Sequence, residues 1–172
     1  MTPQEFQSIY PQVISWIRLT LDTHVPQARP ITSLGFQRLK QYFSDALLAS
    51  TKVVAVDQVP MPPLGKLGLH QFTEFANGNY DGVTYLDTFF VKRHRATDEW
   101  LHFHELIHVV QWRLLGPQEF LAMYAAGLEA HGYRNSPLEV MAYNAEDVFF
   151  RNAGAFDAEQ WVAAQLMPMR AG

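Results

Sequence analysis

Residues 103–114 carry the pattern that most limits how this chain can fold. On a helical wheel of about 100° per residue with His104 at zero, His108 falls near 40° and Glu105 near 100°. The apolar residues of the stretch fall between roughly 200° and 300°. They are Phe103, Leu106, Ile107, Val110 and Leu114. A helix here therefore packs one side into a core and presents its polar side chains on the other.

The N-terminal part of the chain predicts two helices. Thr2, Pro3 and Glu5 are typical of a helix start, because threonine caps, proline suits the first position and glutamate can close a capping box. The apolar residues that follow recur at helical spacing: Phe6, Ile9, Tyr10, Val13, Ile14, Ile17 and Leu21. A second helix is expected to begin near Ser33. Its apolar face would carry Phe36, Leu39, Phe43, Ala46 and Leu47.

The middle of the chain predicts strands, and the last third predicts helices. Short β-branched or aromatic stretches favour strands at 52–59, 69–75 and 82–92, with the last strand following a turn at 77–82. Capping and breaking residues then favour helices at 97–115 (capped by Thr97), 118–130, 136–152 and after Asp157. This order predicts an α+β fold with a small, mostly antiparallel sheet and further C-terminal helices.

Composition excludes several classes of protein. The chain of 172 residues is 48% hydrophobic with a net charge of −4, which argues against disorder and suits one domain over residues 1–172. The sequence pI of about 5.9 gives no electrostatic case for a nucleic-acid partner. The absence of cysteine excludes disulfides and cysteine ligands. No leader or membrane-spanning run is visible, so a soluble cytoplasmic protein without a membrane partner is expected.

The motif His104-Glu105-Leu106-Ile107-His108 predicts a metal site on the helix. Residues four apart lie above one another, so His104 and His108 can bind one ion. Glu105 lies at an adjacent angle, where it can reach a water held by the metal without being a ligand. This arrangement is the zinc-peptidase helix motif, with the glutamate as general base. The competing interpretation is an ordinary solvated helix face.

A catalytic zinc ion needs a third protein ligand and an open position for water. Glu139 is favoured because it lies in the first turn of a predicted helix, and a helix holds a ligand rigidly. However, Ser136 and Glu139 could instead form a capping box at that helix start. Glu146 is the next candidate. The other residues considered are Glu129, His131 and Asp147.

Two segments together resemble a known family. The first is His104-Glu105-Leu106-Ile107-His108-Val109-Val110-Gln111-Trp112, and the second runs from Tyr133 through Asn135-Ser136-Pro137-Leu138-Glu139 to Tyr143. They resemble small bacterial metallopeptidase-like proteins of the gluzincin type, over about residues 84–152. The resemblance implies a zincin-like fold, zinc ligands His104, His108 and Glu139, and Glu105 as base. It also implies a strand along the substrate cleft, which 82–91 matches.

The chain departs from that family in two respects. Between His108 and Glu139 lie 30 residues, more than thermolysin-like enzymes use. Tyr143 stands where those enzymes carry an aspartate that orients a histidine, so Glu146 or Gln111 is expected to take that task. Candidates for a donor to the developing oxyanion are Tyr133, His131, Arg134 and Tyr143.

These features predict zinc-dependent hydrolysis of a peptide bond by a metal-activated water. His104, His108 and Glu139 would hold the Zn²⁺ ion, and Glu105 would take a proton from the water and pass it to the leaving amine. The substrate would be a peptide or protein. The alternatives are a zinc-bearing binding or regulatory module without turnover, and a hydrolase acting on a bond other than a peptide bond.

Overall fold

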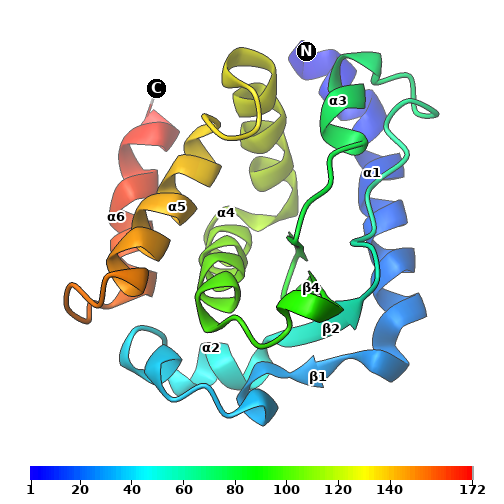
Figure 1. Ribbon diagram of the computed structural model, residues 1–172. Coiled ribbons are helices and arrows are strands. Elements are labelled where there is room, and N and C mark those ends of the chain that lie inside the picture. Colours follow the sequence, from blue (N-terminus) through cyan, green and yellow to red (C-terminus); the bar gives the residue numbers. More distant parts are fainter. Residues whose placement is uncertain (172) are drawn as a thin grey trace.

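The computed structural model describes residues 1–171 and has an α+β architecture. Its helices are α1 (Pro3–His24), α2 (Asp45–Ser50), α3 (Thr73–Ala76), α4 (Glu99–His131), α5 (Pro137–Phe150) and α6 (Ala158–Ala171). Its strands are β1 (Arg29–Pro30), β2 (Lys52–Val56), β3 (Gly82–Tyr85) and β4 (Thr88–Lys92). The first half of α4 lies in the middle of the molecule, with α5 and α6 on one side and the sheet and α1 on the other (Figure 1).

The predicted small sheet is mixed: two of its three strand pairings are antiparallel, as expected, and the third is parallel. Its strand order is β1-β2-β4-β3. The central pair, β2 and β4, is parallel with Val54 opposite Phe90, whereas β1 and β3 pair antiparallel at the two edges. The long segment between β2 and β4 allows them to run in the same direction. As a result β3 is an edge strand and faces the region of the metal motif.

The predicted single strand over 82–92 is a hairpin of β3 and β4. Tyr85 pairs with Thr88, and the two residues between them form the turn. Leu86 there has a φ of 58°, in the left-handed region that a leucine rarely adopts. The sequence does not predict this turn, because neither of its residues is glycine or asparagine, the usual signals for a two-residue hairpin loop.

Two other predicted elements are wrong. In place of one helix from Ser33, the chain forms 3₁₀ turns at Ile31–Leu34 and Arg38–Gln41 and then α2, whose Ser44 cap accepts from the Leu47 amide. Gly35, at a φ of 74°, ends the first turn and prevents a continuous helix. Residues 69–75 form a 3₁₀ turn, His70–Phe72, and the start of α3 in place of a strand.

Helix boundaries agree with the capping signals at several points. The Thr2–Glu5 capping box at the start of α1 is confirmed. Helix α5 begins at Pro137, and the Asp157 side chain accepts from the Gln160 amide at the start of α6. The cap of α4 is Asp98 and not Thr97.

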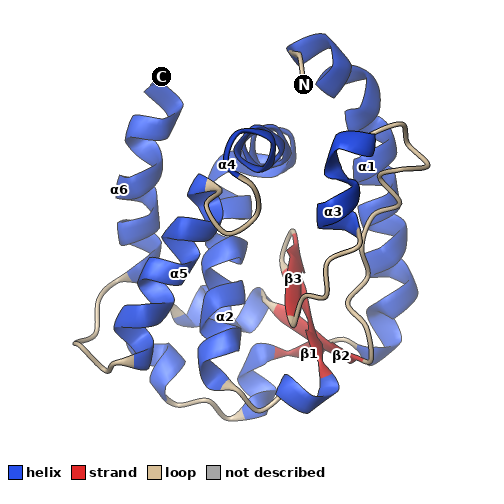
Figure 2. Cartoon of the chain, turned by 45° about the horizontal axis from the view of Figure 1, so that its top comes forward, coloured by secondary structure: helices blue, strands red, loops and turns tan. Residues whose placement is uncertain are grey.

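Helix α4 consists of two helical halves joined at Gly116. Gly116 has φ 73° and ψ 165°, a conformation that is essentially restricted to glycine, and Pro117 follows it. The predicted break is therefore present, and the chain changes direction there before ending at Gly132. The two halves point in different directions in Figure 1, and one of them is seen end-on in Figure 2.

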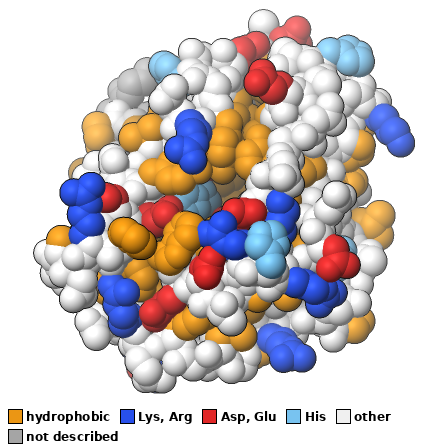
Figure 3. All heavy atoms as spheres, viewed as in Figure 1, with side chains coloured by type: hydrophobic (Ala, Val, Ile, Leu, Met, Phe, Trp, Pro, Cys, Tyr) orange, Lys and Arg blue, Asp and Glu red, His pale blue; other side chains and the backbone are white. Residues whose placement is uncertain are grey.

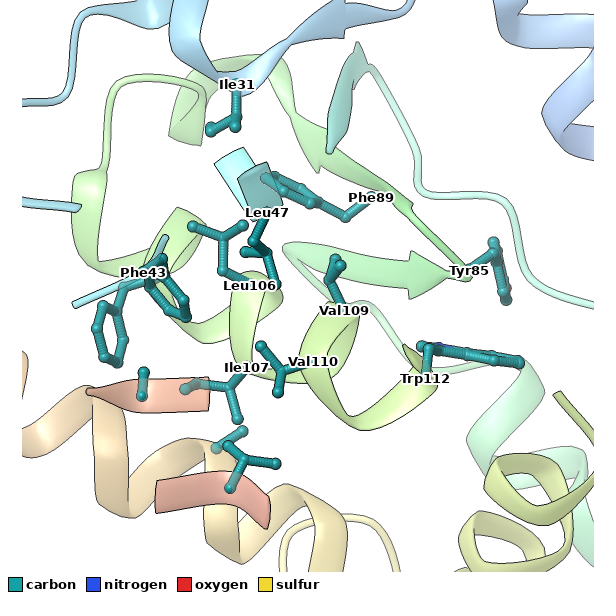
Figure 4. Packing of buried hydrophobic residues seen from close by; sticks show 14 of the residues in the cluster. Ile31, Phe43, Leu47, Tyr85, Phe89, Leu106, Ile107, Val109, Val110 and Trp112 are labelled. Atoms are coloured by element: carbon teal, nitrogen blue, oxygen red, sulfur yellow. The ribbon is translucent and has the colours of Figure 1, made fainter. Parts of the chain in front are cut away.

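The core forms around the first half of α4, where every residue from 101 to 112 is buried. Leu106 and Val109 point toward Leu47 of α2 and Phe89 of β4, whereas Ile107 points toward the C-terminal helices (Figure 4). Burial on both sides fixes the rotation of the helix and therefore the direction of its histidines. Within residues 1–171, no helix combines the length and apolar character needed to cross a membrane.

Candidate metal centre

His104, Glu105 and His108 are buried, with exposed fractions of 4%, 3% and 5%. A solvated helix face would leave these side chains in water, so that alternative is wrong. They lie away from the packed side of α4, toward β3 and the start of α5. In Figure 3, histidine atoms lie at the bottom of a hollow with hydrophobic and charged side chains around it. The helix thus buries its motif beside a cleft and not within the hydrophobic core.

Glu139 on α5, exposed by only 2%, completes a group with the two histidines that can hold a metal ion. The two histidine Nε2 atoms are 3.2 Å apart. The Glu139 carboxylate lies 3.5 Å from His104 Nε2 through Oε2 and 3.4 Å from His108 Nε2 through Oε1. Ligands about 2.0–2.1 Å from a tetrahedral zinc ion lie roughly 3.3 Å from one another. The distance between the two Nε2 atoms, and the distance from each of them to its nearer carboxylate oxygen, are close to that value.

Hydrogen bonds at the far side of each imidazole ring fix its tautomer. His104 Nδ1 donates to Glu146 Oε2 at 2.7 Å, and His108 Nδ1 donates to Gln111 Oε1 at 2.8 Å. The Gln111 amide nitrogen donates to the Leu138 carbonyl, so its oxygen faces the histidine. With both protons on Nδ1, the two Nε2 lone pairs and the Glu139 carboxylate point at one another. A cation bound between them would remove the electrostatic repulsion among these groups.

Glu139 does not act as a helix cap. Ser136 makes no side-chain capping bond, so the predicted alternative of a capping box is wrong. The Glu139 Oε1 atom instead accepts from the Tyr124 hydroxyl at 2.6 Å. Its Oε2 atom is buried without a hydrogen-bond partner. A buried carboxylate oxygen without a hydrogen-bond partner, 3.5 Å from an imidazole nitrogen, fits the role of a metal ligand.

The expectation that Glu146 or Gln111 orients a histidine is confirmed for both residues, and Glu146 is not part of the ligand group. Tyr143, at the position of the family's aspartate, packs against His104 with ring centres 4.7 Å apart. The remaining ligand candidates lie elsewhere: Asp147 pairs with Arg151, and Glu129 and His131 are exposed.

Comparison with protein-family models, curated proteins and solved structures finds no match to this chain. The functional assignment therefore depends on the geometry of the site and on the chemistry of its side chains.

Glu105 lies beside the ligand group without belonging to it. Its Oε2 atom accepts from the Thr84 hydroxyl at 2.6 Å, which ties the carboxylate to β3. Gly82, also on β3, leaves room for it, because a Cβ atom at that position would lie 2.2 Å from Glu105 Oε1. Trp112 Nε1 donates to the Thr84 carbonyl at 3.2 Å and holds the strand against α4. The edge strand thus positions the carboxylate.

Two cavities meet at this carboxylate. The open one is polar and includes Arg95, Arg134, Tyr143 and the His104 side of the group. The other is apolar and includes the His108 and Glu139 side. Glu105, Tyr133, Tyr80 and Gly82 line both. A substrate at the metal site would therefore have polar surroundings on one side and apolar surroundings on the other.

Sequence reasoning missed three contributors to the site. Thr84 and Gly82 act from a strand, and Tyr124 acts from the second half of α4. Each is far in sequence from the residue that it contacts, and no local pattern marks it. Of the predicted oxyanion donors, Tyr133, Arg134 and Tyr143 line the open cavity, whereas exposed His131 lines neither cavity.

The charges within the ligand group shift its pKa values. Burial opposes protonation of His104, but the Glu139 and Glu146 carboxylates outweigh it and raise the pKa of His104 to about 10. Burial likewise acts to raise the pKa of Glu139, yet the His108 and His104 imidazoles lower it well below its usual range. Without a metal, protons take the place of the cation between the carboxylate and the imidazoles.

We expect Glu139→Gln to weaken zinc binding by more than the roughly 10–100-fold that loss of an outer partner costs. Glutamine keeps the shape of glutamate but is a poor zinc ligand. The measurement is zinc affinity by competition with a chelator, together with elemental analysis, which should find about one zinc per wild-type chain. Asp147→Asn, an exposed change on the same helix, is the control. Unchanged affinity in the Glu139 variant would exclude it as a ligand.

We also expect zinc binding at pH 7 to release at least one proton per ion. His104 holds a proton in the metal-free protein because its pKa is raised to about 10, and the ion must displace it. Affinity should therefore rise with pH through the neutral range and weaken as the pH falls. Calorimetric titration in two buffers of different ionisation enthalpy measures the released protons. Binding enthalpies that do not depend on the buffer would contradict the proton assignment.

Proposed function

We propose that this protein is a zinc-dependent hydrolase of peptide bonds with chemistry like that of the gluzincins. The observation that carries the proposal is the placement of Glu105, a buried carboxylate next to three ligands but outside their group. Binding a metal does not require this residue. Thr84 and Gly82 nevertheless hold it at the junction of two cavities, where a substrate and a water would meet.

Zinc is the metal that the donor set favours. Two imidazole nitrogens and one carboxylate, with ligand separations close to a tetrahedral edge, form the three-ligand set of catalytic zinc sites. The cavity beside His104 leaves a side of the group open for a further ligand. A bound zinc ion would supply a Lewis acid that polarises a carbonyl group and acidifies water.

Glu105 is the proposed general base and, later, the general acid. Burial raises the pKa of this carboxyl, and the neighbouring His104 and His108 charges oppose the rise. A raised pKa suits a group that accepts a proton and returns it near neutral pH. Glu105 takes a proton from the attacking water and passes it to the leaving amine. The Thr84 hydrogen bond keeps the other side of its carboxylate fixed during both transfers.

Tyr133 is the proposed donor to the developing oxyanion. It lines both cavities together with Glu105. Burial and then the Glu139 charge raise the pKa of Tyr133 well above its usual range, so the hydroxyl keeps its proton. Packing against Tyr80, with ring centres 4.6 Å apart, holds the ring in place. A hydroxyl that keeps its proton, on a ring held in place at the boundary of the two cavities, is what stabilisation of an oxyanion needs.

The edge strand β3 favours an extended peptide as substrate. The Thr84 carbonyl accepts from Trp112 of α4 and therefore points away from β4. The N–H and C=O groups of Gly82, two residues earlier in β3, also point away from β4. An added peptide strand could pair with Gly82, and its backbone would then lie beside the Glu105 carboxylate. This geometry favours a peptide over other hydrolysable groups.

We expect Glu105→Gln to retain about one zinc per chain and the native fold, and to lower hydrolysis by about 10²–10⁴-fold, the usual worth of acid–base catalysis. Quenched fluorescent peptide libraries, with and without a chelator, measure the activity, and elemental analysis measures zinc. Glu119→Gln on the second half of α4 is the matched control. If the zinc-loaded wild type cleaves no peptide, the protein is a zinc-bearing binding module. If the variant loses zinc, Glu105 is a ligand and not the base.

Tyr133→Phe is expected to lower kcat by about 10²–10³-fold with KM and zinc content almost unchanged, because the lost hydroxyl acts on the transition state. Tyr143→Phe provides the comparison, since Tyr143 lines the same open cavity and its ring packs on His104. Steady-state kinetics on one cleaved peptide separate the two residues. A larger loss in the Tyr143 variant would reverse the assignment.

A further inference from the structure

A second apolar cavity lies directly beyond the one at the metal centre. Each has a volume of about 80 Å³. Five residues line both: Val13, Pro62, Phe75, Leu121 and Tyr124. The first cavity reaches His108 and Glu139, whereas the second extends between α1, residues 62–75 and the second half of α4. The two cavities therefore lie in a row that leads away from the ligand group.

Both spaces are partly open to the surface, so a group from outside can enter them. About 10–15 Å³ of space is enough for one water, so each cavity is several times larger than that minimum. The second cavity is lined by aliphatic and aromatic side chains such as Phe6, Ile9 and Leu128, which offer water few partners. An apolar occupant suits it better than water.

Tyr124 joins the second cavity to the chemistry of the site. Its ring lines both cavities, and its hydroxyl donates to Glu139 Oε1 at 2.6 Å. A group held beside Glu139 therefore lies against the same ring that borders the more distant space. Most of the distant walls belong to α1 and residues 62–75, outside the segments that resemble the gluzincins.

We propose that the two cavities together hold one extended apolar group of the substrate, attached next to the bond that is cleaved. That this group belongs to a substrate rests on the proposed function, whereas the binding of an apolar group in the two cavities does not. The group is either a long peptide side chain or an acyl chain, because both present the same chemistry to these walls. The polar cavity on the His104 side then holds the remainder of the substrate.

Straight-chain 1-alkanols of four to ten carbons test the site in metal-free protein by calorimetry. Affinity should rise about fourfold per added methylene group until both cavities are filled. Ala125→Leu places bulk in the second cavity and should abolish the increments for the longer chains. Ala126→Leu makes the same change at the next position of the helix, which is exposed, and should keep the affinity increments of the longer chains. Ala125→Val, which adds less bulk, serves if the leucine variant does not fold.

Affinity that does not rise with chain length, or Ala125 and Ala126 variants that behave alike, would overturn the proposal. Zinc-loaded protein then distinguishes the two sources of the group. Leucine and phenylalanine hydroxamates represent side chains, and octanoyl hydroxamate represents an acyl chain. The apolar group comes from the class of hydroxamate that binds Ala125→Leu more weakly than it binds the wild type. If neither class binds the variant more weakly, the proposal is also overturned. Alkanol binding without any peptide cleavage would contradict only the proposed function.

Discussion

The site depends on one electrostatic constraint, that two imidazole nitrogens and a carboxylate point at a common centre inside the protein. The histidine tautomers are fixed from outside by Glu146 and Gln111, so the lone pairs cannot turn away. Bringing these groups together without a positive charge is costly in a buried environment. Either protons or a metal ion must therefore accompany the packing of α5 onto α4. The fold and the occupancy of the site are consequently linked.

The position of α4 makes this arrangement possible. Its first half is covered by the sheet on one side and by the C-terminal helices on another, which fixes its rotation. The break at Gly116 then turns the second half so that Tyr124 can reach Glu139. A straight helix would carry Tyr124 away from the first half by about 1.5 Å per residue. Helix α4 thus contributes two of the three candidate ligands, His104 and His108, and also the residue that holds the third, Glu139.

Local chemistry in the sequence predicted much of the site and part of the fold. The helical wheel of residues 103–114 predicted the direction in which His104 and His108 point. The position of Glu139 at the start of a helix favoured it as the third member of their group. Pairing between distant segments was not predictable, since the parallel partnership of β2 and β4 leaves no mark in either strand. The helix expected from Ser33 failed for a local reason, the left-handed Gly35, although its apolar residues Leu39, Phe43 and Leu47 are buried as expected.

The space at Gly82 has a consequence for how this protein tolerates mutation. Its backbone is not in the left-handed region, so folding alone does not demand glycine at this position. The requirement comes instead from the Glu105 carboxylate, which occupies the place where a side chain would begin. A single methyl group there would displace the carboxylate and leave His104, His108 and Glu139 untouched. A lineage could therefore lose the proposed base and keep the three candidate metal ligands through one codon change outside the motif helix.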